Sequence, residues 1–158
     1  MTQKNNATKD IISSWVLMTS DHAGYDLKQS LADWLQNNGY GVELFGAQSI
    51  DASDYPDDAA KLSDALLNHQ DKTTMAIAIC GSGIGMAIAL NRYSHIRAAL
   101  CHDIEDAKLS RKHNNANVLV LAARKTSIAM VKDIIKTFQE TDFDNKAERH
   151  VRRVNKLK

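Results

Sequence analysis

The chain of 158 residues holds little proline, cysteine or glycine, with one, two and seven of these residues. The two cysteines, Cys80 and Cys101, have no C-x-x-C spacing, so they indicate neither a disulfide framework nor a zinc site. Every apolar run is too short to span a bilayer, and the polar start of the chain lacks the apolar region of a secretion signal. We therefore expect a cytoplasmic protein with reduced thiols and no membrane contact.

An excess of charge of one sign is also missing. Twenty basic and 19 acidic residues leave a formal charge of +1, which gives no surface-wide field for nucleic acid or a membrane. The six histidines include no helical pair four residues apart and no set with carboxylates at metal-ligand spacing, so we expect no metal site. A charged ligand must therefore be bound by a local group of residues.

The chain does contain short apolar runs that alternate with segments of helical period. The runs predict strands at 15–18, 42–45, 75–79, 96–101 and 118–122. This alternation predicts a single α/β domain, with a five-stranded parallel sheet covered by helices on both faces and ligands at the carboxyl ends of the strands. We expect residues 1–14 to be a mobile extension and residues 15–155 to be the domain, including a C-terminal basic helix or tail.

The most informative segment is Ile79-Cys80-Gly81-Ser82-Gly83-Ile84-Gly85-Met86, a thiol at the end of an apolar run followed by a glycine-rich turn. Its backbone N–H groups can bind an anion, and a helix N-terminus stabilises a thiolate. Three interpretations are open. The segment is a tight turn with a buried cysteine, a dinucleotide fingerprint that has Met86 in place of glycine, or the site of acid/base or nucleophilic chemistry by Cys80.

Polar residues follow the other predicted strands. Asp21 and His22 come after the first strand, where they could share a proton, although a helix cap is the commoner role for such an aspartate. His113 and Asn114 lie between a helix and the fifth strand, in a position that can face solvent or another subunit. Arg124 ends that strand and could meet phosphate, although solvated arginines are commoner there.

The C-terminal stretch concentrates cations. In a helix, Arg149, Arg152 and Arg153 would lie on one side, and paired guanidinium groups bind phosphate. A basic tail that only aids solubility is an equally good interpretation.

Taken together, six motifs resemble the ribose-5-phosphate isomerase B family, which includes the galactose-6-phosphate isomerase subunits. The motifs, in order from Ser20 to Val154, are Ser20-Asp21-His22-Ala23-Gly24, Asp54-Tyr55-Pro56, the segment from Ile79 to Met86, Arg97-Ala98-Ala99, His113-Asn114-Asn115-Ala116-Asn117-Val118 and Arg149-His150-x-x-Arg153. The resemblance implies a Rossmann-like three-layer α/β/α sandwich, no metal and no organic cofactor. It also implies a homodimer, or a dimer of dimers, with active sites shared across the interface.

The resemblance also implies roles. Cys80 would be the base that moves a proton between C1 and C2 of the open-chain sugar through an enediolate, and Ser82 would assist at the sugar oxygens. The N–H groups of the turn would hold the enediolate oxygen, an oxyanion-hole role that falls to Gly81, Gly83, Ile84, Gly85 and Met86.

Further roles concern the ring and the phosphate. Asp21 and His113 would open the sugar ring, with Asn114 as a polar partner. Tyr55 would lie near the sugar, and the phosphate would be held by Arg149 and Arg153, with contributions from His22 and Arg124. His150 matches the motif, but the resemblance assigns it no clear role.

Several features place the chain within the family. Cys80 is present where a subgroup of the family uses a glutamate a few residues later, so the chain falls in the cysteine-base subgroup. Two departures, at 15–19 and at Ala122-Ala123, touch no catalytic residue type. Both halves of the composite site stand in one chain, which argues against a galactose-6-phosphate isomerase subunit. We expect ribose 5-phosphate as the substrate; allose 6-phosphate, galactose 6-phosphate and a non-catalytic sugar-phosphate binder are the alternatives.

Overall fold

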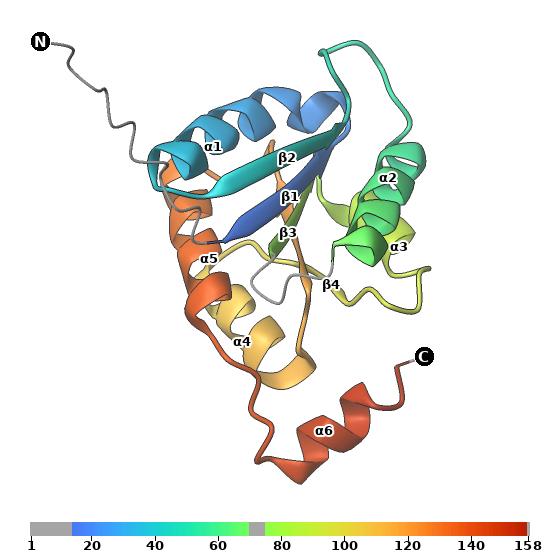
Figure 1. The fold of residues 1–158 in the computed structure, drawn as a ribbon, viewed down its shortest axis with the longest axis vertical. Coiled ribbons are helices and arrows are strands. Elements are labelled where there is room, and N and C mark those ends of the chain that lie inside the picture. Colours follow the sequence, from blue (N-terminus) through green and yellow to red (C-terminus); the bar gives the residue numbers. More distant parts are fainter. Residues whose placement is uncertain (1–13, 70–74, 158) are drawn as a thin grey trace, which may run out of the picture.

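The computed structural model describes residues 14–69 and 75–157, and these form a sheet of five parallel strands with helices on both faces (Figure 1). The strands are β1 (Trp15–Ser20), β2 (Gly41–Gly46), β3 (Met75–Cys80), β4 (Ala98–Leu100) and β5 (Val118–Ala122). The helices are the 3-10 turn η1 (His22–Gly24), α1 (Tyr25–Asn37), α2 (Tyr55–Asn68), α3 (Ile84–Leu90), α4 (Ile104–Asn114), α5 (Ile128–Glu140) and α6 (Glu148–Val154). The predicted mobile extension, residues 1–14, lies outside the described residues except for Ser14.

The order of the strands creates a point where the chain changes direction across the sheet. The order is β2-β1-β3-β5-β4, with every neighbouring pair parallel. The chain leaves β1 toward β2 on one side and returns as β3 on the other side of β1. In parallel sheets, a ligand crevice forms outside the carboxyl ends of the strands at such a point. Asp21 directly follows β1 and Cys80 ends β3, so both lie at this point.

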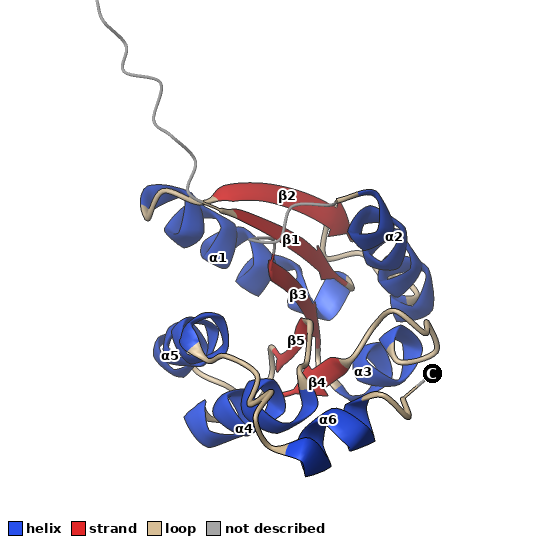
Figure 2. Ribbon diagram, turned by 60° about the horizontal axis from the view of Figure 1, so that its bottom comes forward, coloured by secondary structure: helices blue, strands red, loops and turns tan. Residues whose placement is uncertain are grey.

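Alternate side chains of the strands enter two separate apolar layers, as the period of a strand requires. On β3, Ile77 and Ile79 pack in the layer that contains side chains of α1, α4 and α5, whereas Ala78 and Cys80 pack in the layer of α2 and α3. Figure 2 shows α1, α4 and α5 on one face of the sheet and α2 and α3 on the other. The predicted three-layer α/β/α sandwich is confirmed.

One predicted strand is shorter than expected. The apolar run at 96–101 predicts six residues, whereas β4 covers only Ala98–Leu100. The N–H of Arg97 donates to the side-chain oxygen of Asn117 at 2.7 Å, and this bond takes the place of a strand pairing before β4. Ile96 is nonetheless buried, so its apolar side chain indicates packing in the core and not a place in a strand.

No helix in the described parts of the chain is both long and apolar enough to cross a membrane.

Candidate active site

In the turn after β3, two of the predicted catalytic side chains accept hydrogen bonds from backbone N–H groups. The N–H of Gly83 donates to Sγ of Cys80 at 3.1 Å, and the N–H of Ile84 donates to Oγ of Ser82 at 3.3 Å. Gly83 allows this because it adopts a left-handed conformation, with φ of +77°, directly before α3. An N–H aimed at sulfur stabilises a thiolate, which is the form of cysteine that acts as a base or nucleophile.

Asp21 is fixed beside this turn. Its N–H donates to the carbonyl of Ile79 at 3.1 Å, and its Oδ1 accepts from the N–H of Gly24 at 3.0 Å. The capping role considered for this aspartate is therefore confirmed, although it caps the 3-10 turn η1 that precedes α1. The first of these contacts places the Asp21 backbone one residue beyond β1 and next to the end of β3.

Tyr55 and Arg124 reach the turn because glycines leave room for them. A Cβ on Gly85 would lie 2.8 Å from Cζ of Tyr55, and one on Gly81 would lie 3.2 Å from a guanidinium nitrogen of Arg124. The backbone N–H of Arg124 also donates to the carbonyl of Gly81 at 3.0 Å. Arg124 lies in the turn two residues after β5, slightly later than the strand end that was predicted. The carboxyl edge of the sheet thus gathers a thiol, a hydroxyl, a carboxylate, a phenol and a guanidinium.

His22 lies on η1 and is tied to Ser53 in the loop before α2. Its N–H donates to Oγ of Ser53 at 3.1 Å, and its Nδ1 accepts from the N–H of Ser53, also at 3.1 Å. Oγ of Ser53 in turn donates to the buried carboxylate of Asp58 at 3.1 Å. Sequence reasoning missed Ser53 and Asp58, because no local pattern signals a contact between residues 31 positions apart.

His113 and Asn114 lie at the other edge of the sheet. They are the last two residues of α4, and the chain then enters β5 at its amino end. The pairing of β3 with β5 runs from Ala76 beside Val118 to Cys80 beside Ala122, so Cys80 stands at the carboxyl edge. A single chain therefore does not bring His113 or Asn114 to Cys80.

Helix α6 also lies at this amino edge of the sheet. His113, Asn114 and the side chains of α6 together form what we call the amino-edge group. The rings of His113 and His150 stack, with centroids 4.3 Å apart and planes 13° from parallel. His150 is buried, and among the described residues its Nε2 has no hydrogen-bond partner. Burial lowers the pKa of His150, and the neighbouring His113 ring and Arg149 lower it further. Arg149 and Arg153 are exposed on the same helix, so cations and imidazoles gather here.

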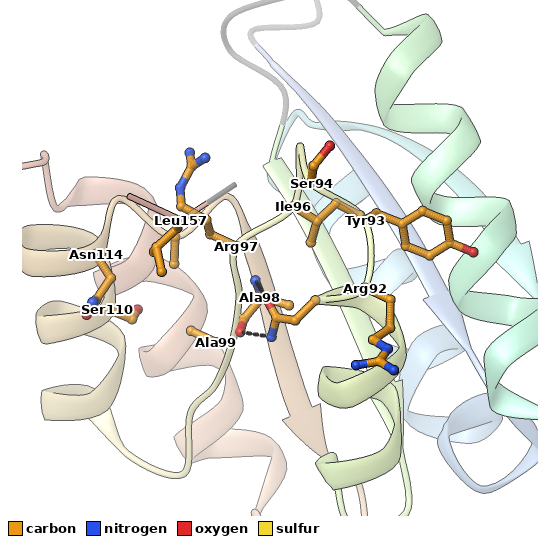
Figure 3. A pocket seen from close by; sticks show the side chains of 12 residues that line it. Arg92, Tyr93, Ser94, Ile96, Arg97, Ala98, Ala99, Ser110, Asn114 and Leu157 are labelled. Carbon is orange, nitrogen blue, oxygen red and sulfur yellow. Dashed lines mark hydrogen bonds between the residues drawn. The ribbon is translucent and has the colours of Figure 1, made fainter. Parts of the chain in front are cut away.

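A cavity of about 470 Å³ opens at the same edge (Figure 3). It lies between the segment that leads into β4 and the end of α4, and Asn114 contributes to its wall. The full lining is Asn91, Arg92, Tyr93, Ser94, Ile96, Arg97, Ala98, Ala99, Ser110, Asn114, Ala116 and Leu157. Because Cys80 is not part of this lining, the cavity belongs to the amino-edge group and not to the cysteine turn.

The second cysteine differs from Cys80 in its surroundings. Cys101 is fully buried, and burial raises the pKa of its thiol to about 12. A thiol with such a pKa stays protonated at neutral pH and is a poor base.

Within residues 14–69 and 75–157, no group of three or more histidine, cysteine, aspartate or glutamate side chains is arranged to hold a metal ion.

Comparisons with known proteins show which family the chain resembles. The sequence model of a family described as ribose/galactose isomerase matches residues 16–157. Ribose-5-phosphate isomerase B of Mycolicibacterium paratuberculosis is 37% identical over 143 residues, which cover 90% of this chain and 88% of the relative. D-erythrulose-4-phosphate isomerase of Pectobacterium atrosepticum is 37% identical over 134 residues, which cover 82% of this chain and 84% of the relative.

The fold comparison points the same way. The crystal structure of a ribose 5-phosphate isomerase from Thermotoga maritima superposes with a TM-score of 0.85 at 41% sequence identity, covering 92% of this chain and 97% of the other. The sheet, the cysteine turn and these matches define a sugar-phosphate isomerase of the aldose–ketose class. The chain belongs to the ribose-5-phosphate isomerase B family, and the resemblance drawn from the six motifs is confirmed.

Proposed function

We propose that this chain interconverts ribose 5-phosphate and ribulose 5-phosphate in the cytoplasm, without a metal or an organic cofactor, and that Cys80 is the base. The observation that carries the proposal is the position of Sγ of Cys80. It accepts the N–H of Gly83 at 3.1 Å, at the point of the sheet where ligands bind, with the Asp21 backbone bonded to the neighbouring Ile79. The other thiol, Cys101, is held in its protonated form by burial.

The reaction follows from this placement. The Cys80 thiolate takes the proton from C2 of the open-chain aldose, and the C–H electrons form the double bond of an enediolate between C1 and C2. The same proton returns to C1, while a proton passes from O2 to O1, so the aldehyde becomes a hydroxymethyl group and C2 becomes a ketone. Ser82 assists at these oxygens. The turn from Gly81 to Met86 supplies N–H groups toward the developing negative charge.

Ring opening and phosphate binding require the second group of residues. Asp21 and His113 act as the acid/base pair on the cyclic sugar, with Asn114 as a partner. Because His113 and Cys80 stand at opposite edges of the sheet, we propose a homodimer, or a dimer of dimers, in which each site combines the cysteine turn of one copy with α4 and α6 of the other.

The substrate contacts divide in the same way. Tyr55, which packs on Gly85, lies near the sugar from the carboxyl-edge side. Arg124 and His22 approach the phosphate from that side, and Arg149 and Arg153 approach it from the other copy.

The test is isomerisation of ribose 5-phosphate in EDTA-treated buffer, read as formation of ribulose 5-phosphate. We expect Cys80→Ala to lower kcat by about 10²- to 10⁴-fold, which is the usual contribution of a positioned acid/base group. Binding of the substrate, measured by calorimetry, should change little. The matched control is Cys101→Ala, which removes the other thiol and should keep wild-type turnover.

Either of two results would overturn the assignment. Turnover that survives in Cys80→Ala would mean that another group is the base. Equal loss in both cysteine variants would show that the effect comes from damage to the core and not from removal of the base.

A second substrate class is favoured by one specific observation, the 37% identity to a relative named as an isomerase of D-erythrulose 4-phosphate. The chemistry at C1 and C2 is the same for sugars of four, five or six carbons, and only the distance to the phosphate differs. Because other relatives of similar identity are named as ribose-5-phosphate isomerase B, we expect kcat/KM to be highest for ribose 5-phosphate in a panel that includes erythrulose 4-phosphate, allose 6-phosphate and galactose 6-phosphate. A higher value for any of the other three would reassign the substrate while leaving the reaction type in place.

A further inference from the structure

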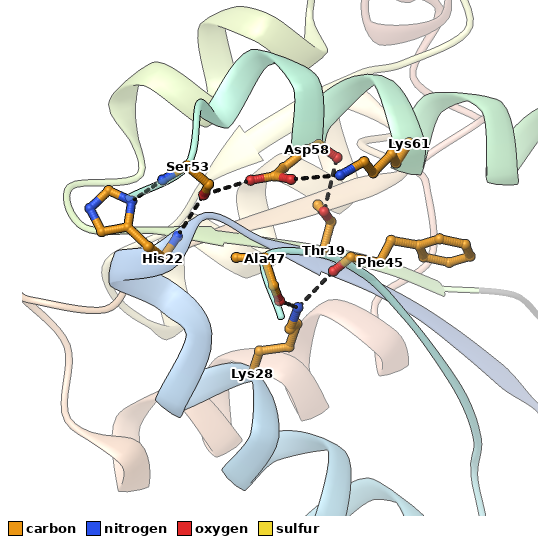
Figure 4. Close-up of polar contacts among 8 residues, drawn as sticks. All are labelled: Thr19, His22, Lys28, Phe45, Ala47, Ser53, Asp58 and Lys61. Carbon is orange, nitrogen blue, oxygen red and sulfur yellow. Dashed lines mark hydrogen bonds and ion pairs between the residues drawn. The ribbon is translucent and has the colours of Figure 1, made fainter. Parts of the chain in front are cut away.

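His22 and Ser53 form a closed ring of two hydrogen bonds across 31 residues of sequence. The backbone N–H of His22 donates to Oγ of Ser53, and the backbone N–H of Ser53 donates to Nδ1 of the His22 ring, both at 3.1 Å. Figure 4 shows the imidazole of His22 turned so that Nδ1 faces Ser53 and the other nitrogen, Nε2, points away from it. The imidazole is thus held by the loop before α2 as well as by its own position on η1.

This ring of bonds determines which nitrogen carries the proton. A backbone N–H can only donate, so Nδ1 of His22 must be the acceptor and holds no proton. In the neutral imidazole the proton is then on Nε2, because the tautomer is set by the hydrogen bond that the other nitrogen makes. The nitrogen that points away from Ser53 is therefore an N–H donor.

Asp58 determines the orientation of the Ser53 hydroxyl. Its side chain is 3% exposed, and its carboxylate accepts from Oγ of Ser53 at 3.1 Å and from Nζ of Lys61 at 3.2 Å. A serine hydroxyl has one proton and two lone pairs. Because that proton goes to Asp58, a lone pair is left to accept the N–H of His22.

The network is anchored in the strand that carries the Ser20-Asp21-His22 turn. The carbonyl of Asp58 accepts from Oγ1 of Thr19, a fully buried residue of β1, at 2.9 Å. The first turn of α2 is thereby tied to β1 just before the residues of the candidate site. Movement of His22 relative to the sheet is therefore opposed by its own position on η1, directly after β1, and by the loop before α2, since Thr19 ties the first turn of α2 to β1.

We propose that Ser53 and Asp58 are positioning residues that hold His22 as an Nε2–H donor directed at the substrate phosphate. The phosphate part of this inference rests on the proposed function, whereas the tautomer of His22 does not. In this arrangement His22 binds the phosphate and takes no part in proton transfer at C1 or C2. Ser53 and Asp58 act through His22 and do not touch the substrate.

The tautomer is measured by long-range proton–nitrogen NMR on protein labelled with ¹⁵N-histidine, at pH 8 without substrate. The variant His22→Gln assigns the His22 signals among those of the six histidines. We expect the shift of an unprotonated nitrogen for Nδ1 and that of a protonated nitrogen for Nε2. We also expect inorganic phosphate to move the Nε2 signal. A protonated Nδ1 would overturn the proposal whether or not the protein isomerises ribose 5-phosphate.

Kinetics test the positioning role. We expect Ser53→Ala to raise KM for ribose 5-phosphate about fivefold, with kcat within about twofold of wild type, because the bond that holds the His22 N–H is a neutral one and its loss has an effect of about that size. The Nδ1 signal in this variant should keep the shift of an unprotonated nitrogen, because the backbone N–H of residue 53 still donates to it. Ser53→Thr keeps the hydroxyl and should restore the wild-type KM.

The control is Lys61→Met, which removes the exposed partner of Asp58 and keeps the bond to Ser53. It should leave KM within about twofold, because partly exposed ion pairs contribute little. A Ser53→Ala variant with wild-type KM would overturn the positioning role. So would a variant in which kcat falls at unchanged KM, since that pattern indicates an interaction made only in the transition state. If ribose 5-phosphate is not turned over at all, the proposed function fails, and the NMR experiment still decides the tautomer.

Discussion

At the scale of single residues, Lys28 carries a charged group that is buried as deeply as Asp58. It is 2% exposed, and its Nζ donates to the carbonyls of Phe45 and Ala47 at 2.7 and 2.6 Å (Figure 4). Burial lowers the pKa of Lys28 to about 8, an effect that nearby Asp58 partly opposes. A neutral amine retains two N–H donors, so both hydrogen bonds can persist after the proton is lost.

This burial predicts how stability depends on pH. Between about pH 8 and the ordinary lysine pKa near 10.5, the unfolded chain binds the Lys28 proton and the folded chain does not. The contribution of Lys28 to the free energy of unfolding therefore rises with pH across this window, by up to about 3 kcal/mol. Urea unfolding at pH 7.5 and pH 10.5 would measure it.

The control for this prediction is Lys28→Met, compared at the same two pH values. The variant should lack the rise that Lys28 causes, while every other titrating group still contributes equally. Its lower stability from the two unpaired carbonyls does not matter, because the difference between the pH values is what is compared. Identical pH dependence in the two proteins would contradict the buried, neutral lysine.

The two cysteines give a second prediction at this scale. Burial raises the pKa of Cys101 to about 12, so at pH 8 this residue is a thiol and not a thiolate. We expect Cys80→Ala, in which Cys101 is the remaining cysteine, to resist alkylation by iodoacetamide in the folded state and to be alkylated fully in urea. Intact mass spectrometry gives the answer. Rapid labelling of the folded variant would show that Cys101 is accessible.

At the scale of secondary-structure elements, α2 and α3 pack in one apolar layer and also meet at the candidate site, where Tyr55 lies against Gly85. A Cβ on Gly85 would lie 2.8 Å from Cζ of Tyr55, so Gly85→Ala must push the ring of this exposed tyrosine away from α3. We expect KM for ribose 5-phosphate to rise about tenfold, equivalent to about 1.4 kcal/mol of lost substrate binding.

The comparison variant for this element is Gly39→Ala. Gly39 has φ of +85° and no atom within 4 Å of an added Cβ, so alanine strains the backbone without a clash. It stands at the end of the α1 segment, at the amino edge and away from the cysteine turn. Gly39→Ala should lower Tm and leave KM unchanged. If Gly85→Ala has the same KM as wild type, Tyr55 does not contribute to substrate binding.

Elements differ in how well the sequence predicts them. The run at 75–79 predicts β3 to within one residue, because both faces of a central parallel strand are apolar and every residue of Met75–Cys80 is buried. The run that contains Ile96 misleads, because that side chain packs in the core while the Arg97 N–H bonds to Asn117. Burial and strand pairing coincide in the middle of a sheet and separate at its edge.

The residues of the candidate site also differ in how well the sequence predicts them. Cys80 is visible in the sequence because its glycine turn is local, whereas the bond between His22 and Ser53 depends on two loops that meet only in the folded chain. The motif that contains His113 predicts the chemistry of this residue but not the edge of the sheet at which it lies. The topology of a parallel sheet, with α4 running back to the amino edge, decides that place.

At the scale of the whole molecule, this topology makes a composite site testable by mixing two inactive variants. Consider Cys80→Ala together with His113→Ala, carried on chains with different tags and refolded as a mixture. In a mixed dimer, one site combines both defects and the other combines the intact Cys80 of one chain with the intact His113 of the other. If the pairing is random, about half of the dimers are mixed and half of their sites are intact, so activity should return to about one quarter of wild type.

The purified mixed species, selected by both tags, should show about half of the wild-type kcat and an unchanged KM. Two inactive chains whose sites were each complete within one copy could not restore any turnover, because every site would carry one of the two defects. The control mixes Cys80→Ala with Ser82→Ala, which lie on the same turn at the carboxyl edge. In that pair each site still receives one defective turn, so the mixture should stay inactive, and recovery there would mean that chains exchange the cysteine turn itself.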